Sequence, residues 1–214
     1  MLGLWHLTEA PTELWPQLPQ ADHYQARVPA TADATRQAQW LAGRLLLHAL
    51  LADAGASPGL VVQNDATGRP WLAGAPHHFV VSLSHSGTWA AAVLSRGGRV
   101  GVDVEMIRDK AQRLASKFLA ADEWAAAEAA TAAAPGLASA HYTRLWSAKE
   151  SLYKLAARRG IIFKSQLLLG AAEPDAAGKI PATLVLDGIQ TRHCICCSQP
   201  APGYVLTYCH EPAA

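Results

Sequence analysis

The stretch Val100-Gly-Val-Asp-Val-Glu-Met-Ile107 has the alternating pattern of a β-strand with one apolar and one acidic face. Because strand side chains point alternately to opposite faces, the valines share one face and Gly101, Asp103 and Glu105 share the other. The two acids are then about 6.6 Å apart along the strand, twice the rise of about 3.3 Å per residue, so both can reach one hard cation. A solvated polar face is the alternative, although Asp is unfavourable inside a strand.

Around this strand the sequence predicts a mixed α+β fold. Turn-forming residues precede it, and with them an antiparallel meander of three short strands is predicted. Helical periodicity with caps and breakers predicts helices on both sides, the first capped by Thr31 or Asp33. The predicted strands are 79–83, 89–94, 100–107, 183–186 and 204–208, and the predicted helices are 31–54, 110–134 and 139–159. We therefore expect two α+β halves, residues 1–99 and 100–214.

Composition excludes several classes of protein. The chain has 214 residues, 50% of them hydrophobic, with 16% charged residues and a formal net charge of +1. This balance argues against a nucleic-acid-binding protein with a basic surface and against a disordered acidic chain. No apolar run reaches the roughly 18 residues of a membrane span, and the first residues lack the features of a signal peptide. A cytoplasmic protein that binds neither nucleic acid nor membrane is expected.

The four cysteines do not form a convincing zinc motif. Cys194 and Cys197 have a usable spacing, but Cys209 and His210 would have to complete the site. We expect reduced cysteines on a buried strand.

A second acidic position lies in the predicted helix that contains Trp146-Ser-Ala-Lys-Glu-Ser-Leu-Tyr-Lys154. At 100° per residue, Trp146, Glu150 and Lys154 form one ridge, opposite an apolar face directed at the core. Glu150 could be a third carboxylate for a metal, and Lys154 a cation for a phosphate. An exposed Glu–Lys pair on a solvated helix is the alternative, with a contribution of only about 0.3–0.5 kcal/mol.

The segment Ser84-His85-Ser86 is expected where the strand 79–83 ends and a turn begins. Binding groups often lie on such loops, and His and Ser can donate hydrogen bonds to phosphate oxygens. Local turn chemistry, in which the serines bond to their own backbone, is the alternative. A serine hydrolase is not favoured, because the chain lacks a Gly-x-Ser-x-Gly elbow.

Taken in order, four motifs resemble the Sfp-type 4'-phosphopantetheinyl transferase family. They are Gly68-Arg69-Pro70, Val81-Ser-Leu-Ser-His-Ser86, Gly101-Val-Asp-Val-Glu105 and Trp146-Ser-Ala-Lys-Glu-Ser-x-x-Lys154. The resemblance implies two similar halves related by a pseudo-twofold axis, with the site in a cleft between them. The chain length is similar to that of family members that are monomers, so a monomer is expected.

The resemblance also implies residue roles. Asp103, Glu105 and Glu150 would bind Mg²⁺ together with the diphosphate of coenzyme A, and Lys154 would neutralise that diphosphate. The residues implied in coenzyme A binding are Arg27, Arg69, Ser84, His85, Lys149 and Lys154. Lys149 could instead only position its helix. His48 stands where the family often has arginine.

The activity implied by the resemblance is Mg²⁺-dependent transfer of 4'-phosphopantetheine from coenzyme A to a serine of an apo acyl or peptidyl carrier protein. Glu150 would act as the base, directly or through a water molecule, and Lys154 would stabilise the leaving phosphate. Lys110, Arg113, Lys117 and Phe118 are candidates for a basic or apolar surface that docks an acidic carrier. The alternatives are a Mg²⁺-dependent hydrolase of coenzyme A-like diphosphates and a non-catalytic carrier-binding module.

Overall fold

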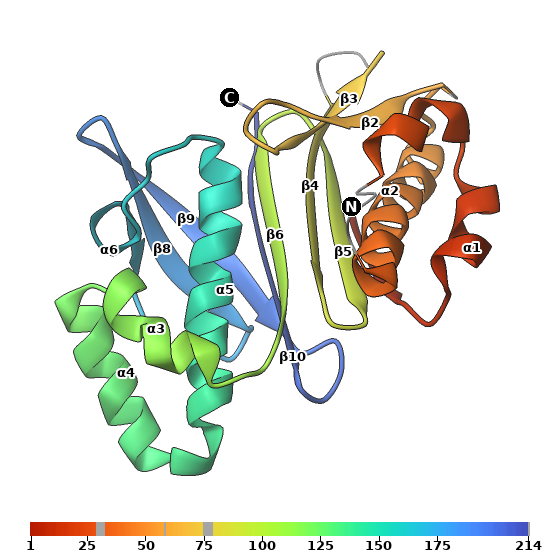
Figure 1. Ribbon diagram of the computed structural model, residues 1–214. Coiled ribbons are helices and arrows are strands. Elements are labelled where there is room, and N and C mark those ends of the chain that lie inside the picture. The colour runs from red at the N-terminus through yellow and green to blue at the C-terminus, as the bar shows by residue number, and fades with distance from the viewer. Residues whose placement is uncertain (29–32, 58, 75–78, 214) are drawn as a thin grey trace. The chain divides into compact units, whose positions relative to one another are not determined.

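The computed structural model describes residues 1–28, 33–57, 59–74 and 79–213, which divide into two compact units (Figure 1). One unit comprises residues 1–98 with the last two residues of the chain, and the other comprises residues 99–212. Each unit combines helices with antiparallel strands, which confirms the α+β prediction. None of the helices in these described ranges is both long and apolar enough to span a bilayer.

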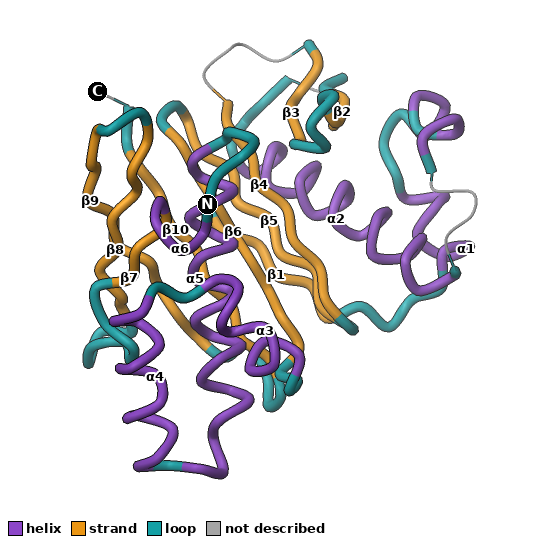
Figure 2. Tube along the Cα trace, turned by 60° about the vertical axis from the view of Figure 1, so that its left-hand side comes forward, coloured by secondary structure: helices purple, strands orange, loops and turns teal. Residues whose placement is uncertain are grey.

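The N-terminal unit packs one long helix, α2, against a three-stranded antiparallel sheet in the order β1-β5-β4 (Figure 2). A separate hairpin pairs β2 with β3. Asp33 caps α2 by accepting a hydrogen bond from the Arg36 backbone N–H at 2.8 Å, as predicted, whereas Thr31 lies outside the described residues. The elements are β1 (Leu2–His6), α1 (Pro11–Leu14), α2 (Ala34–Asp53), β2 (Val61–Asn64), β3 (Pro70–Ala73), β4 (Phe79–Ser86) and β5 (Trp89–Arg96), with 3-10 turns at Trp15–Gln17, Ala21–His23 and Gln25–Arg27.

The C-terminal unit is built on a five-stranded antiparallel sheet in the order β6-β10-β9-β8-β7. Helix α5 lies along one face of this sheet, and α3 and α4 flank α5 (Figures 1 and 2). The elements are β6 (Arg99–Met106), α3 (Lys110–Phe118), α4 (Ala121–Ala133), a 3-10 turn (Pro135–Leu137), α5 (Ala138–Ala156), α6 (Phe163–Gln166), β7 (Leu167–Leu169), β8 (Lys179–Leu186), β9 (Ile189–Ser198) and β10 (Tyr204–Glu211).

Two parts of the predicted strand arrangement were wrong. The third strand of the expected meander, β6, pairs with β10 in the C-terminal unit, so the described strands form a hairpin of β4 and β5 rather than a three-stranded meander. The chain makes this change at Gly97 and Gly98, which both have a positive φ that favours glycine. β4 also runs three residues further than predicted, to Ser86, so Ser84–Ser86 lie within the strand and the turn follows at Gly87 and Thr88.

The predicted helix 110–134 is interrupted. Leu119 and Ala120 are extended, and the side chain of Glu123 caps α4 by accepting a hydrogen bond from the Ala120 backbone N–H at 2.6 Å. Because neither Gly nor Pro lies at this break, alanine-rich periodicity alone did not reveal it.

The cysteines lie on β9 and β10 as free thiols. Only Cys209 is buried, and Cys194 is exposed, so the expectation of a fully buried cysteine strand was wrong.

Gly101 determines how closely α5 approaches β6. A Cβ atom at this position would lie 1.8 Å from the Ser151 carbonyl oxygen and 2.8 Å from the Leu155 backbone nitrogen. Both distances are too short, and backbone atoms cannot move away as a flexible side chain can. The backbone of α5 therefore occupies the position that a side chain at residue 101 would need.

Gly101→Ala is expected to destabilise the protein by at least about 3 kcal/mol, because α5 must move away from β6. Urea unfolding measures this loss. Gly136→Ala is the matched control, since a Cβ atom at Gly136 would meet nothing within 4 Å and should change stability little. Equal unfolding midpoints for the two variants would contradict the close approach.

Candidate active site

The acidic face of β6 and the ridge of α5 face each other inside the C-terminal unit. The Lys154 ammonium donates hydrogen bonds to Asp103 Oδ1 at 2.8 Å and to the Val102 carbonyl at 2.9 Å. About two turns of α5 away, the Trp146 indole donates to Glu105 Oε1 at 3.3 Å. The ridge therefore packs on the strand, and the alternative of a solvated Glu–Lys pair is not what the structure shows.

Glu150 lies between Trp146 and Lys154 on α5, and its pKa depends on its burial and on the neighbouring charges. Burial is the largest cause that raises the pKa of Glu150, and the carboxylates of Asp103 and Glu105 raise it further. The Lys154 ammonium lowers it in part, and the resulting pKa is about 7. A carboxyl group with such a pKa exchanges its proton near neutral pH, which suits a general base. Four of the predicted site residues thus form one electrostatic cluster.

A buried hydroxyl pair holds α5 against the sheet behind this cluster. Thr207, which pairs with Asp103 across β10 and β6, donates to the Ser147 carbonyl at 2.7 Å, and the two hydroxyls lie 2.9 Å apart. Both residues are fully buried. The sequence analysis did not identify Thr207, because its role depends on strand pairing across more than 100 residues.

The three acids suit a divalent cation by their chemistry, since hard carboxylate oxygens are the ligands that Mg²⁺ prefers. In the part of the chain that the structure describes, however, no three acidic, His or Cys side chains are grouped as a set of metal ligands. Asp103 instead directs one oxygen at Lys154. The magnesium assignment of Asp103, Glu105 and Glu150 therefore stays a prediction.

The prediction that Lys149 binds coenzyme A needs correction. Its side chain is completely buried, and its ammonium donates to Glu123 Oε2 at 2.5 Å, to the Phe118 carbonyl at 2.9 Å and to the Phe163 carbonyl at 3.1 Å. These three acceptors use all three of its protons. Lys149 is therefore not placed to bind coenzyme A, and the alternative that it positions its helix is the one that the structure supports.

The remaining predicted residues belong to the N-terminal unit. Ser84 and His85 are consecutive on β4 and point to opposite faces, so Ser84 is buried and His85 is exposed. Arg69 follows the Asp65–Gly68 turn and is half-buried, and Arg27 is exposed at the end of a 3-10 turn. A role of these four residues in binding coenzyme A stays a prediction.

Arg44 is a residue whose environment the sequence did not reveal. Its guanidinium stacks on the Trp40 ring at 3.3 Å and donates to Asn64 Oδ1 at 2.7 Å, which ties α2 to the turn before Arg69. Burial lowers its pKa to about 9, with a further lowering by the charge of Arg27. The contact between Trp40 and Arg44 could have been predicted from their i, i+4 spacing, which places both side chains on the same face of a helix.

His48, which stands where the family often has arginine, contacts the protein interior. Its Nε2 lies 3.1 Å from the Tyr24 hydroxyl, and burial lowers its pKa, so the ring is neutral at physiological pH. The Tyr24 hydroxyl also accepts a hydrogen bond from the Val62 backbone N–H at 2.7 Å. The surroundings of His48 are those of a packing residue.

Comparison with known proteins connects both units to one group of enzymes. Residues 23–95 match the model of the 4'-phosphopantetheinyl transferase N-terminal domain. Among curated proteins, 4'-phosphopantetheinyl transferase AcpT of Salmonella typhimurium is 38% identical over 141 residues, which cover 64% of this chain and 66% of that protein. The AcpT of Escherichia coli K12 is 35% identical over 122 residues, covering 56% of this chain and 57% of that protein.

A more distant relative, 4'-phosphopantetheinyl transferase psf-1 of Bacillus pumilus, is 29% identical over 117 residues, covering 54% of this chain and 48% of that protein. The chain thus spans less than two thirds of the length of these relatives. Residues 99–209, just over half of the chain, fit the 4'-phosphopantetheinyl transferase superfamily model, and this range includes the whole cluster of acids and Lys154. The chain belongs to the 4'-phosphopantetheinyl transferase superfamily.

Proposed function

We propose that this protein transfers the 4'-phosphopantetheine group of coenzyme A to a serine of an apo acyl or peptidyl carrier protein and releases adenosine 3',5'-bisphosphate. The observation that carries the proposal is the meeting of Asp103 and Glu105 on β6 with Glu150 and Lys154 on α5. The names of the curated relatives support the same activity.

The chemistry requires a base for the serine hydroxyl and a cation for the charge on the phosphates. Glu150 accepts the proton as the serine oxygen attacks the β-phosphorus. The bond from that phosphorus to the oxygen of the leaving bisphosphate breaks, and Lys154 stabilises the negative charge that develops there.

Asp103, Glu105 and Glu150 would hold Mg²⁺, which when bound supplies charge neutralisation for the diphosphate. In the structure the Lys154 ammonium neutralises Asp103. We propose that Lys154 leaves Asp103 for the diphosphate when coenzyme A binds, since its side chain is 26% exposed and has room to move.

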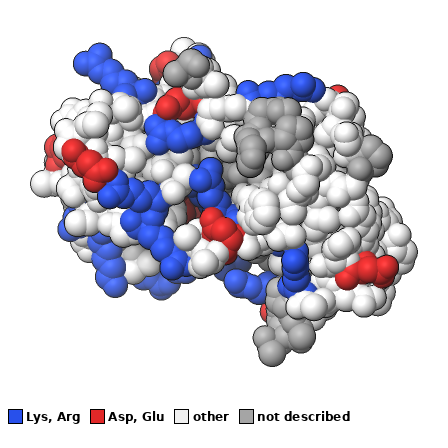
Figure 3. All heavy atoms as spheres, turned by 90° about the horizontal axis from the view of Figure 1, so that it is seen from above, with Lys and Arg blue, Asp and Glu red and all other residues white. Residues whose placement is uncertain are grey.

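The expected partner is an acidic carrier protein. The exposed residues Lys110, Arg113 and Lys117 on α3, which follows β6, offer basic groups for docking. Figure 3 shows Lys and Arg side chains gathered, with some acidic side chains among them, on the left-hand part of the face seen there. Such positive surface favours association with acidic proteins and with the anionic coenzyme A.

An intact-mass assay against a panel of apo carriers, with coenzyme A and Mg²⁺, tests the function. A mass increase of about 340 Da on the carrier, the size of the phosphopantetheinyl group, is expected. Rapid breakdown of coenzyme A without a carrier would instead indicate a hydrolase. Binding of coenzyme A without any mass change on any carrier would indicate a non-catalytic module.

Lys154→Ala is expected to lower kcat/KM for carrier modification by about 100-fold, because a cation beside the transferring phosphate is lost. The same mass assay, followed over time, measures this. Lys179→Ala, at an exposed position on β8, is the control for a general loss of positive charge and should retain kcat/KM. An unchanged kcat/KM in Lys154→Ala would mean that the lysine only neutralises Asp103.

A further inference from the structure

A buried ion pair includes the residue that precedes the proposed base in the chain. Lys149 precedes Glu150 in α5, and its ammonium meets the Glu123 carboxylate at 2.5 Å, with side-chain exposures of 0% and 5%. Taking two charges out of water is costly, and burial lowers the pKa of Lys149. Such a pair is retained only where its hydrogen bonds are well satisfied, so its partners show what it holds together.

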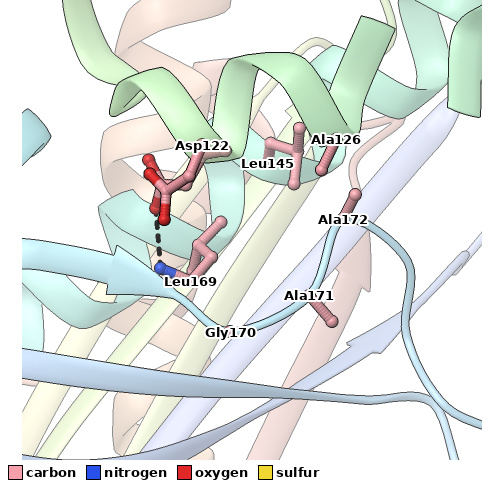
Figure 4. Close-up of a pocket in the computed structure, with 8 residues that line it drawn as sticks. Asp122, Ala126, Leu145, Leu169, Gly170, Ala171 and Ala172 are labelled. Atoms are coloured by element: carbon pink, nitrogen blue, oxygen red, sulfur yellow. Dashed lines mark hydrogen bonds between the residues drawn. The ribbon is translucent and has the colours of Figure 1, made fainter. Parts of the chain in front are cut away.

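The partners of the pair come from four separate segments. The ammonium also binds the carbonyls of Phe118, at the end of α3, and Phe163, at the start of α6. The carboxylate of Glu123 also accepts hydrogen bonds from the backbone N–H groups of Ala120 at 2.6 Å and Leu169 at 2.7 Å. The bond at Leu169 is the dashed line in Figure 4. The pair thus links α3, α4, α6 and β7 to α5.

Two of these segments carry the rings that hold Trp146. The Phe118 ring meets the Trp146 ring edge-on at 5.1 Å, and the Phe163 ring stacks on it at 5.6 Å. Trp146 in turn donates its indole N–H to Glu105. A continuous chain of contacts therefore runs from the Lys149 ammonium, through two carbonyls and two aromatic rings, to one of the proposed metal ligands.

We propose that Lys149, with Glu123, is a positioning residue that fixes Trp146 and thereby the orientation of the Glu105 carboxylate, a role that rests on the proposed transferase function. Without the ammonium, the Phe118 and Phe163 carbonyls lose a shared donor and their rings no longer clamp the indole. Glu105 then samples orientations in which it does not face the other acids. A displacement of about 1 Å in such a site can lower the rate by about 100-fold.

The space around Glu123 should allow variants without Lys149 to fold, so that the positioning role of Lys149 can be tested. A hollow of about 240 Å³ lies beside Glu123, and its lining includes Asp122, Ala126, Leu145 and Ala172 (Figure 4). Water in this hollow can hydrate Glu123 once its partner is removed. In the double variant Lys149→Met/Glu123→Gln neither charge of this pair remains, and the amide oxygen still offers an acceptor to the Leu169 N–H.

The experiment compares Lys149→Met, the double variant and Ile195→Ala, a control in the same core that takes no part in these hydrogen bonds. Thermal unfolding, kcat and KM are measured for each. We expect the double variant to regain most of the unfolding temperature lost in Lys149→Met, while kcat stays about 100-fold below that of the native protein. Ile195→Ala should unfold at lower temperature with its kcat unchanged.

A second readout does not depend on activity. In protein labelled with 5-fluorotryptophan, the ¹⁹F resonance of Trp146, assigned by its loss in Trp146→Phe, should shift or broaden in both Lys149 variants and stay unchanged in Ile195→Ala. A native Trp146 resonance, or a kcat restored together with stability in the double variant, would overturn the proposal. If the native protein modifies no carrier, the proposed function fails, and the resonance still shows whether Lys149 positions Trp146.

Discussion

Asp103→Asn is expected to lower kcat/KM for carrier modification by about 100- to 1,000-fold while the protein remains folded. Asp103 is only 4% exposed, and its carboxylate is both the partner of Lys154 and the most buried of the three acids proposed for Mg²⁺. Asn keeps the shape of the side chain but removes the charge that a divalent cation requires. Lys154 is partly exposed, so water can solvate its ammonium and limit the stability loss to about 1–3 kcal/mol.

Time courses of the carrier mass shift at several Mg²⁺ concentrations measure this effect. Glu211→Gln is the matched control, because it makes the same acid-to-amide change on the neighbouring strand β10, where Glu211 pairs with Arg99 at 2.5 Å. Its kcat/KM should be that of the native protein. Native turnover and an unchanged Mg²⁺ requirement in Asp103→Asn would remove Asp103 from the proposed site.

Glu150→Gln is expected to change activity and stability in opposite directions. Removing the base should lower kcat by about 100-fold or more. Because the folded protein raises the Glu150 pKa from 4.5 to about 7, folding favours the protonated carboxyl, and the stability that this group contributes is lost as the pH rises through 7. Gln imitates the neutral form, so at pH 8 the variant should be more stable by an amount on the order of 2 kcal/mol.

Urea unfolding at pH 4, 6 and 8 checks the sign of this effect. The gain should be largest at pH 8 and vanish at pH 4, where the native carboxyl is largely protonated in both the folded and the unfolded state. In the native protein, kcat/KM should rise with pH as Glu150 loses its proton, and this step should be missing from the residual activity of Glu150→Gln. A variant that is less stable than the native protein at pH 8, or equally active, would contradict this account of Glu150.

The strand at Val100–Met106 and the ridge of α5 could be predicted because their periodicity is local. Alternation of valines with Gly101, Asp103 and Glu105 requires no knowledge of other segments, and neither does the i, i+4, i+8 spacing of Trp146, Glu150 and Lys154. For β9 the strand at the cysteines was expected, but its burial was not predicted correctly, because Ile189–Ser198 is half-exposed and lacks a clean apolar face. The same reasoning failed at the break between α3 and α4, which depends on tertiary contacts of Glu123 rather than on a Gly or Pro.

The α+β class and the side chains that share a face could be read from the amino-acid sequence, since both follow from backbone geometry within a single element. What those faces contact depends on how distant segments pack: β6 pairs with β10, Gly101 admits the backbone of α5, and Lys149 and Lys154 have different environments. The two lysines lie five residues apart on one helix, about 140° apart around its axis. One therefore points into the packed core and the other toward the acids of β6, and no local pattern distinguishes a buried ammonium from one beside a reactive site.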